Sequence, residues 1–522
     1  MRTQHTPMTV RPWLNALLVF ALLVGVAAAS ETATLDRQLI EAAQCDDPAK
    51  VKALLEKGAS PNAELKDGRT ALMHAARAGR LNSARLLVEA GADVNAKSDK
   101  GATALMLVAA SGTPELVQFL IENGSDVNAA AINGLTPLML AAEGGNTESA
   151  NLLIKDGAHV DAKAKDGMTP LIAAAKWGHR GVAKLLIDEG ADLNVRREDG
   201  VTPLIAAAFD GHLDVVNLLI NAGAGLNDEQ KDGVTALIAA AYKGHSEVVK
   251  LLVAKGADVR SRTRDGATAL MVAAQAGEPD TVRLLINKGL DVNAKSPNGT
   301  NPLELAASKG HVETVDLLIA EGADVNIRGK SGRTPLMIAA HNGYQETVRL
   351  LIKRGAKINI ENQHGQTALV AAVQSEELEV ARLLIENGAS IDVRMGEGVT
   401  PLLIAIQTGK QAMAKLLVEL GADVNSKPRF GGTPLMAALS ARRDDLVRLL
   451  LKKGADVNVK TYAGVTALMS AVEAGDIQMV KLIVEKGAQV NARTQDGETA
   501  LSLAEMSGRS DVVRYLRKHV AD

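Results

Sequence analysis

Hydrophobic and polar positions alternate along this chain in one order that recurs every 33 residues, without insertions, from about residue 35 to the end. Each period opens on a Thr, followed by Ala or Pro and then Leu, and continues as a short apolar run. In most periods a Gly interrupts the chain nine residues after the Thr, and a second apolar run with paired Leu residues follows. Apolar residues at spacings of three and four predict amphipathic helices. Each period therefore predicts two short helices, and the repetition predicts a solenoid whose units pack on their neighbours.

The residues that bound these helices have physical reasons for their places. Thr is a good N-cap, and Pro or Ala suits the first helical position. Gly tolerates the left-handed conformation that ends a helix. Pairs such as Asp199-Gly200 precede the Thr and favour tight turns. The period is thus turn, helix, helix and projecting loop, and the residues that mark it are Thr70, Thr103, Thr136, Thr169, Thr202, Thr235, Thr268, Asn301, Thr334, Thr367, Thr400, Thr433, Thr466 and Thr499.

In this pattern the chain resembles the ankyrin repeat family, over roughly residues 35–522. One repeat shows the whole motif in Gly200, Thr202, Pro203, Leu204, Ala207, Gly211, His212, Leu218, Leu219 and Gly223. The resemblance implies an all-α repeat solenoid of about fifteen ankyrin repeats, each a helix-turn-helix with a β-turn loop. It does not by itself imply a function, because one fold hosts many roles.

Two kinds of position depart from the family motif. Three residues after the Thr, where the family often has His, this chain holds mostly apolar residues such as Met73 and Ile172, and Glu304 in one repeat. We expect burial there to replace a helix-end hydrogen bond. The interrupting Gly is replaced by Glu376 and by Arg442, which suggests local irregularities.

The ends of the chain differ from its middle. Residues 35–64 lack the Thr-Pro-Leu step and form an expected N-terminal capping repeat, residues 65–493 the central repeats, and residues 494–522 a C-terminal capping repeat, all within a solenoid of residues 30–522. Residues 1–29 form a different segment, in which Arg2 and Arg11 precede an apolar run that ends in three alanines at Ala29. This is the pattern of a cleaved signal peptide.

The signal segment predicts a periplasmic or secreted protein, with cleavage near Ala29. The alternative is an uncleaved membrane anchor, although the apolar run is short for a span of about 20 residues. A chain with one cysteine, Cys45, cannot form an internal disulfide. We expect Cys45 to be partly buried, the alternative being a reactive or intermolecular thiol. The even repeats and capped ends favour a monomer.

Composition and charge argue against two classes of function. The formal net charge is −3, whereas nucleic-acid binding proteins usually carry a basic excess. The chain lacks nucleotide-binding, hydrolase and zinc-protease motifs, and its histidines form no ligand cluster in the sequence. His179, His212, His245 and His311 recur at one repeat position, which favours a structural role at a helix start. His74, His341 and His364 stand singly, with no paired base or nucleophile evident. We therefore expect neither catalysis nor a cofactor nor a metal.

The resemblance implies a concave groove, lined by turn tips and first helices, that usually binds protein. Three aromatic residues fall on its variable positions in consecutive repeats: Trp177, Phe209 and Tyr242. Apolar residues precede the same or neighbouring Thr landmarks, namely Ile132, Leu135, Met168, Val201 and Val234. Large rings are favoured interface anchors. We predict that these eight residues bind a partner protein, the alternative being that the rings pack within the solenoid. Phe430 and Tyr462 form a secondary patch on adjacent turn tips.

A row of basic residues recurs 27 positions after the landmarks, formed by Lys97, Lys163, Arg196, Arg262, Lys295, Arg328, Arg394, Lys427, Lys460 and Arg493. Acidic residues such as Asp166 and Asp199 lie in the same loops, so local exposed ion pairs are the expected role. The sequence leaves two other functions open beside the protein scaffold. One is a module that binds an anionic polymer or lipid headgroup through this row, and the other is a structural spacer.

Overall fold

The computed structural model describes residues 33–429 and 431–520. It divides into two compact units, Met1–Ser261 and Arg262–Asp522, each of which is described by itself. The signal segment predicted over residues 1–29 lies outside the described residues. Among the helices that are described, none is long and apolar enough to cross a lipid bilayer.

The first unit is a series of helix pairs. It begins with a helix over residues 33–45. The helices that follow are α2 (Pro48–Glu56), α3 (Ala71–Arg77), α4 (Leu81–Glu89), α5 (Ala104–Ser111), α6 (Pro114–Glu122), α7 (Pro137–Glu143), α8 (Thr147–Lys155), α9 (Pro170–Lys176), α10 (Arg180–Asp188), α11 (Pro203–Phe209), α12 (Leu213–Ala222), α13 (Ala236–Lys243) and α14 (Ser246–Ala254).

The second unit repeats the arrangement. It contains α15 (Ala269–Ala276), α16 (Pro279–Asn287), α17 (Pro302–Lys309), α18 (Val312–Ala320), α19 (Pro335–His341), α20 (Gln345–Lys353), α21 (Ala368–Ser375), α22 (Leu378–Glu386), the 3-10 turn η1 (Gly396–Gly398), α23 (Pro401–Gln407), α24 (Gln411–Glu419), α25 (Pro434–Ser440), α26 (Asp444–Lys452), α27 (Ala467–Ala474), α28 (Ile477–Glu485), α29 (Ala500–Met506) and α30 (Ser510–Val520).

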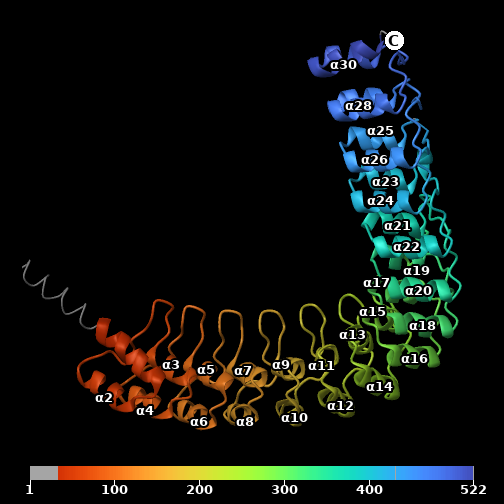
Figure 1. The fold of residues 1–522 in the computed structure, drawn as a ribbon. Coiled ribbons are helices and arrows are strands. Elements are labelled where there is room, and N and C mark those ends of the chain that lie inside the picture. Colours follow the sequence, from red (N-terminus) through yellow and green to blue (C-terminus); the bar gives the residue numbers. More distant parts are fainter. Residues whose placement is uncertain (1–32, 430, 521–522) are drawn as a thin grey trace, which may run out of the picture. The chain divides into compact units, whose positions relative to one another are not determined.

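Two layers of helices make up each unit. From α3 on, the odd-numbered helices open the repeats and pack side by side, and the even-numbered helices form a second layer behind them. In the first unit, the loops between repeats project on the side of the odd-numbered helices (Figure 1). The repeat solenoid of paired helices predicted from the 33-residue period is confirmed.

Each odd-numbered helix from α3 on starts at a landmark residue. The Oγ1 of Thr202 accepts a hydrogen bond from the backbone N–H of Ile205 at 3.3 Å, and its equivalents do the same in other repeats. Such a cap satisfies one of the amides that a helix start leaves without a partner, and it contributes about 1 kcal/mol. The landmark side chains are themselves buried, apart from that of Thr499, so the cap also holds the turn against the helix layer.

Burial at the third position after the landmark follows the expectation from the sequence. Met73 and Ile172 are at most 1% exposed, as are most of their equivalents. Glu304 occupies the same place in α17 and is only 7% exposed. Desolvation by burial raises the pKa of its carboxyl to about 7, although the backbone N–H groups of Asn301 and Gly329 act in the opposite direction.

A ladder of asparagine side chains ties successive loops together within each unit. The Nδ2 of Asn128 donates to the carbonyl of Gly157 at 3.0 Å, and its Oδ1 accepts from the N–H of His159 at 2.9 Å. Asn95 and Asn425 make the same pair of bonds in their own repeats. Each bond joins one repeat to the next, so the ladder fixes the register of the stack.

The recurring histidines also join repeats. The Nε2 of His212 donates to the carbonyl of Lys176, which lies 36 residues earlier at the end of α9, at 2.9 Å. The His212 ring lies so close to Gly178 that a Cβ there would overlap it, and Gly178 has a φ of +75°. The structural role predicted at the helix start is thus a bond to the preceding repeat, because His212 makes no side-chain cap to its own helix.

The two repeats that lack the interrupting Gly keep its backbone conformation. Glu376 has a φ of 63° and Arg442 a φ of 54°, both in the left-handed region. The irregularity suggested by the sequence is therefore not seen in the backbone at these residues. Both residues are instead strained, because a residue with a Cβ in the left-handed region costs about 1 kcal/mol.

Candidate functional site

Three aromatic side chains stand at equivalent ends of three adjacent helices in the first unit. Trp177 caps the C-terminus of α9, Phe209 ends α11, and Tyr242 is the penultimate residue of α13. Their exposed fractions are 49%, 39% and 52%. Helix α11 packs against both α9 and α13, so the rings follow one another along one edge of the first-helix layer. The alternative that they are packed inside the solenoid is not what the structure shows.

Two lysines lie over these rings. The Nζ of Lys176 is 5.3 Å from the centroid of Trp177, and the Nζ of Lys243 is 4.5 Å from Phe209 and 6.0 Å from Tyr242. A cation over an exposed ring contributes about 0.5–1 kcal/mol. We did not identify either lysine from the sequence, although each is the immediate neighbour of a predicted ring. They add positive charge beside an otherwise apolar edge.

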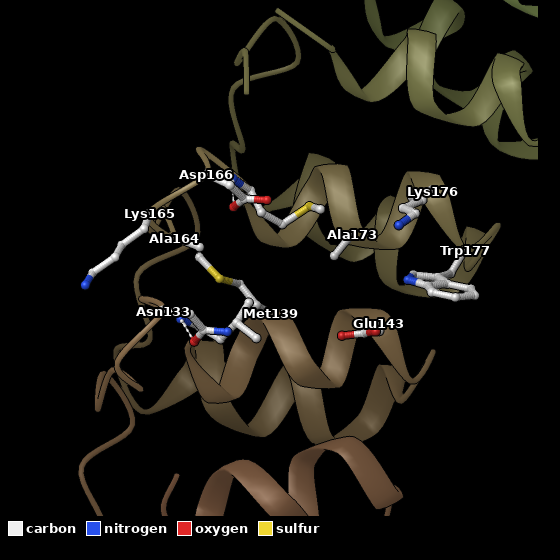
Figure 2. Close-up of a pocket in the computed structure, with 11 residues that line it drawn as sticks. Asn133, Met139, Glu143, Ala164, Lys165, Asp166, Ala173, Lys176 and Trp177 are labelled. Carbon is white, nitrogen blue, oxygen red and sulfur yellow. Dashed lines mark hydrogen bonds between the residues drawn. The ribbon is translucent and has the colours of Figure 1, made fainter. Parts of the chain in front are cut away.

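A hollow of about 340 Å³ lies beside Trp177 (Figure 2). Met139 of α7 and Ala173 of α9 lie in its floor, and Figure 2 shows Glu143 on α7 across from Trp177 and Lys176. Its full lining is Asn133, Leu135, Met139, Glu143, Ala164, Lys165, Asp166, Met168, Ala173, Lys176 and Trp177.

The hollow unites only part of the predicted set. Leu135, Met168 and Trp177 line it, whereas the other five predicted groove residues do not. Met168 and Val201 also pack against the buried cluster of Ile172, Val195 and Ala206, and are partly buried. These two therefore support the turn as well as facing the groove. Leu135 and Val234 are likewise half-buried, and Ile132 is 62% exposed at its turn tip.

The turn tips that border the hollow are held in place by hydrogen bonds that their backbone N–H groups donate. The N–H of Met168 donates to Oδ1 of Asp166 at 3.0 Å, which closes the turn locally. The N–H of Ile132 donates to the carbonyl of Lys100 in the preceding tip at 3.0 Å. Because adjacent tips are bonded to each other, the exposed Ile132 side chain stands on an ordered support.

The electrostatics of the hollow are balanced. Glu143 and Asp166 contribute two negative charges, and Lys165 and Lys176 contribute two positive charges. An apolar floor with charges of both signs at its rim suits a side chain on a polypeptide better than a polyanion. The hollow can therefore contact a ligand through its shape and its apolar area, but it has no strong net electrostatic field.

Of the two residues of the secondary patch, the structure describes Tyr462. Tyr462 is 73% exposed at its turn tip. Phe430, its predicted partner, lies outside the described residues.

The basic row has a different partner from the one expected. The Nζ of Lys295 donates to the carbonyl of Arg328, 33 residues later, at 2.9 Å, and Arg328 in turn donates to the carbonyl of Glu361 at 3.2 Å. Arg196 reaches the carbonyl of Glu229 at 2.6 Å and also pairs with Asp228. The expected pairing with Asp166 and Asp199 is made by Arg197, which is outside the row. Several row cations therefore connect neighbouring loops.

Candidate catalytic groups are few. The hydroxyl of Ser375 lies 2.6 Å from Nδ1 of His341, a pair that we did not find in the sequence. In the ranges that the structure covers, no carboxylate forms an ion pair with His341 that could orient it as a base. His74 is half-buried, and its burial, followed by the charges of Arg69 and Arg77, lowers its pKa.

Metal-binding and thiol groups give no further site. Across residues 33–429 and 431–520, no group of three or more His, Cys, Asp or Glu side chains is placed to hold a metal ion. Cys45 is exposed, so the expectation of partial burial was wrong. Cys45 is the last residue of the helix over residues 33–45, whereas Leu39 and Ala43 form the buried face of that helix.

The comparisons with known proteins concern the repeats alone. A family model described as ankyrin repeats (3 copies) matches residues 39–131, 105–197, 189–263, 255–329, 322–395, 392–461 and 460–522. A search of curated proteins found no match.

Proposed function

The chain belongs to the ankyrin repeat family, and from that premise we propose that it is an exported scaffold that binds a partner protein at the ends of α9, α11 and α13. Trp177, Phe209 and Tyr242 are the anchors of this surface, which we call the aromatic edge. The partner lays apolar side chains against the rings and inserts one into the hollow beside Trp177. The protein acts by occupying or stabilising its partner, without chemical change to it.

One observation carries the proposal, namely three large rings, each more than a third exposed, in three consecutive repeats. A contiguous exposed apolar surface on a soluble protein usually marks a partner site. Rings of this kind lose little side-chain entropy on binding and supply much of the buried area of interfaces. The ladder and the tip-to-tip bonds hold the supporting backbone, so little ordering is required when the partner binds.

Export from the cytoplasm is part of the proposal and rests on residues 1–29. Arg2, Arg11 and the apolar run before Ala29 match a signal peptide. The protein is then periplasmic or secreted and acts there as a monomer. Mass spectrometry of the chain recovered from outside the cytoplasm tests this, because cleavage would leave a new N-terminus near residue 30.

Affinity capture tests the aromatic edge. The full chain, immobilised, is exposed to the organism's own envelope fraction at low and at high salt, beside a variant with Trp177, Phe209 and Tyr242 changed to Ala. We expect the parent to retain one protein at both salt concentrations, and the variant to lose it. Apolar contacts are insensitive to ionic screening, whereas binding through exposed cations weakens with salt.

A matched control separates loss of the site from loss of apolar surface in general. Leu213 and Val312 are 39% and 38% exposed at the starts of the second-layer helices α12 and α18, and neither belongs to the predicted groove residues. Their double Ala variant should capture the partner as the parent does. Equal capture by the parent and by the variant of the aromatic edge would show that the partner does not bind at the aromatic edge. Capture at low salt only, equal in all three baits, would favour an anionic ligand on the basic row.

A further inference from the structure

Two successive turn tips in the second unit differ from all the regular tips around them. The first, residues 394–399, contains the 3-10 turn η1, in which Glu397 has a φ of 62° and a ψ of 13°. This is the left-handed region, which a residue with a side chain occupies at a cost of about 1–3 kcal/mol. Local strain of this kind gathers at binding sites, because only the surrounding structure maintains it.

The second tip begins at Lys427-Pro428-Arg429. In neighbouring tips the residue equivalent to Pro428 donates its N–H across the turn, as Met395 does to the carbonyl of Val399 at 2.9 Å and Thr461 to that of Val465 at 3.0 Å. Pro428 has no N–H, so this tip forgoes that bond. The hydrogen bond that closes the neighbouring tips is therefore absent at Pro428. The rigid proline ring lies beside the cations Lys427 and Arg429.

The two tips and the next one border a shallow, open hollow of about 510 Å³. It is lined by Arg394, Glu397, Gly398, Lys427, Pro428, Arg429 and Tyr462. The three cationic side chains are exposed, and a single carboxylate, that of Glu397, offsets them. The hollow therefore carries a net charge of +2, in contrast to the balanced charges beside Trp177.

Contacts with neighbouring groups orient the guanidinium groups of Arg394 and Arg429, but some of their N–H donors are not used in these contacts. Arg394 uses Nη1 for the carbonyl of Lys427 at 3.2 Å, which anchors its guanidinium at the wall. The Nη1 of Arg429 lies 3.6 Å from Oε1 of Glu397, and the backbone N–H of Arg429 donates to the carbonyl of Glu397 at 2.6 Å. Each guanidinium has five N–H donors, so both retain groups that can face a ligand.

We propose that this hollow binds a small molecule or headgroup that carries a phosphate monoester. Such a group holds close to two negative charges at neutral pH, which matches the net charge of the lining. Guanidinium groups bind phosphate oxygens through parallel N–H donors, and Arg394 and Arg429 approach from two different tips. The Tyr462 ring, 73% exposed, offers a flat apolar face to the part of the ligand that bears the phosphate.

This site is independent of the proposed function. It uses none of the residues of the aromatic edge and lies in the other unit. Within the basic row, Arg394 and Lys427 are the members that line this hollow, where Arg429 and Tyr462 from outside the row join them.

Calorimetric titration of the full chain with phenyl phosphate at low salt tests the proposal. We expect saturable binding that Arg429→Gln weakens by about tenfold or more, since one charge-assisted bond is lost. Tyr462→Ala should weaken phenyl phosphate but leave inorganic phosphate nearly unchanged. Arg264→Gln is the matched control, because Arg264 occupies the equivalent tip position in another repeat and is equally exposed. It should bind as the parent does.

Vesicles distinguish the two sources of the same chemical group. Phosphatidylcholine vesicles with and without phosphatidic acid are tested for binding to the parent and to both Arg variants. Binding that requires phosphatidic acid and is lost in Arg429→Gln alone supports the site with a lipid source. Absence of binding to phenyl phosphate and to these vesicles, or equal losses in the two Arg variants, overturns the proposal. A hexaglutamate peptide that binds more tightly than phenyl phosphate would also overturn it, in favour of an acidic protein segment.

Discussion

Replacing the buried Glu304 by Gln should stabilise the second unit at pH 8 and have much less effect at pH 5. Glu304 lies in α17 where other repeats carry Met or Ile, and its exposed fraction is 7%. Burial is the main cause of the rise in its pKa from 4.5 to about 7, while Lys295 and Arg333 and two backbone N–H groups lower it in part. Gln keeps the shape and the acceptor oxygen but cannot ionise.

The direction in which stability changes with pH follows from the number of protons bound in the folded and in the unfolded state. Between pH 4.5 and 7 the folded chain holds a proton on Glu304 that the unfolded chain has released. The contribution of this group to stability is therefore fully present below pH 4.5 and is lost as the pH rises through 7. The full difference corresponds to about 3.4 kcal/mol, of which about 2.5 kcal/mol is lost between pH 5 and pH 8.

Hydrogen exchange of the α17 and α19 amides is the suitable assay, because a repeat solenoid can open locally instead of unfolding as one unit. After correction for intrinsic rates, Glu304→Gln should slow exchange at pH 8 by about 70-fold more than at pH 5. Glu313, an exposed residue of α18, provides the control, and Glu313→Gln should change little at either pH. A ratio of parent to Glu304→Gln that is the same at both pH values would refute the argument from burial.

Three further substitutions test the local geometry through the midpoint of urea unfolding. Glu376→Gly should stabilise by about 1 kcal/mol, since a φ of 63° strains any residue with a Cβ and the side chain is exposed; a lower midpoint would contradict this. Gly178→Ala should destabilise by about 2 kcal/mol or more, because φ is +75° and the new Cβ would meet the His212 ring. His212→Ala should relieve that overlap in the double variant, so additive losses would argue against the contact. Asn128→Ala should cost about 1–3 kcal/mol, because it removes two exposed hydrogen bonds of about 0.5–1.5 kcal/mol each, to the carbonyl of Gly157 and from the N–H of His159, and an unchanged midpoint would show that water replaces the ladder bonds.

Much of the fold was evident in the order of residues. A helix start that requires a cap, a Thr that supplies it and a Gly that ends the helix are local requirements, and they recur at the same phase in every regular repeat. Because each repeat contacts only its neighbours, local signals repeated at 33 residues are enough to specify the stack. The variable positions that followed from the family resemblance likewise located Trp177, Phe209 and Tyr242 on an exposed edge.

Only the tertiary structure determined the hydrogen bonds and side-chain contacts between one repeat and the next. The hydrogen bond from His212 to Lys176, the bonds from the basic row to carbonyls 33 residues away and the Ser375–His341 pair all join residues distant in sequence. The same holds for the cluster of Arg394, Arg429 and Tyr462, which three separate tips bring together. A residue's sequence neighbours determine its backbone conformation, but its partner is set by the offset between stacked repeats. That offset arises from the packing of whole helix layers, so no single repeat encodes it.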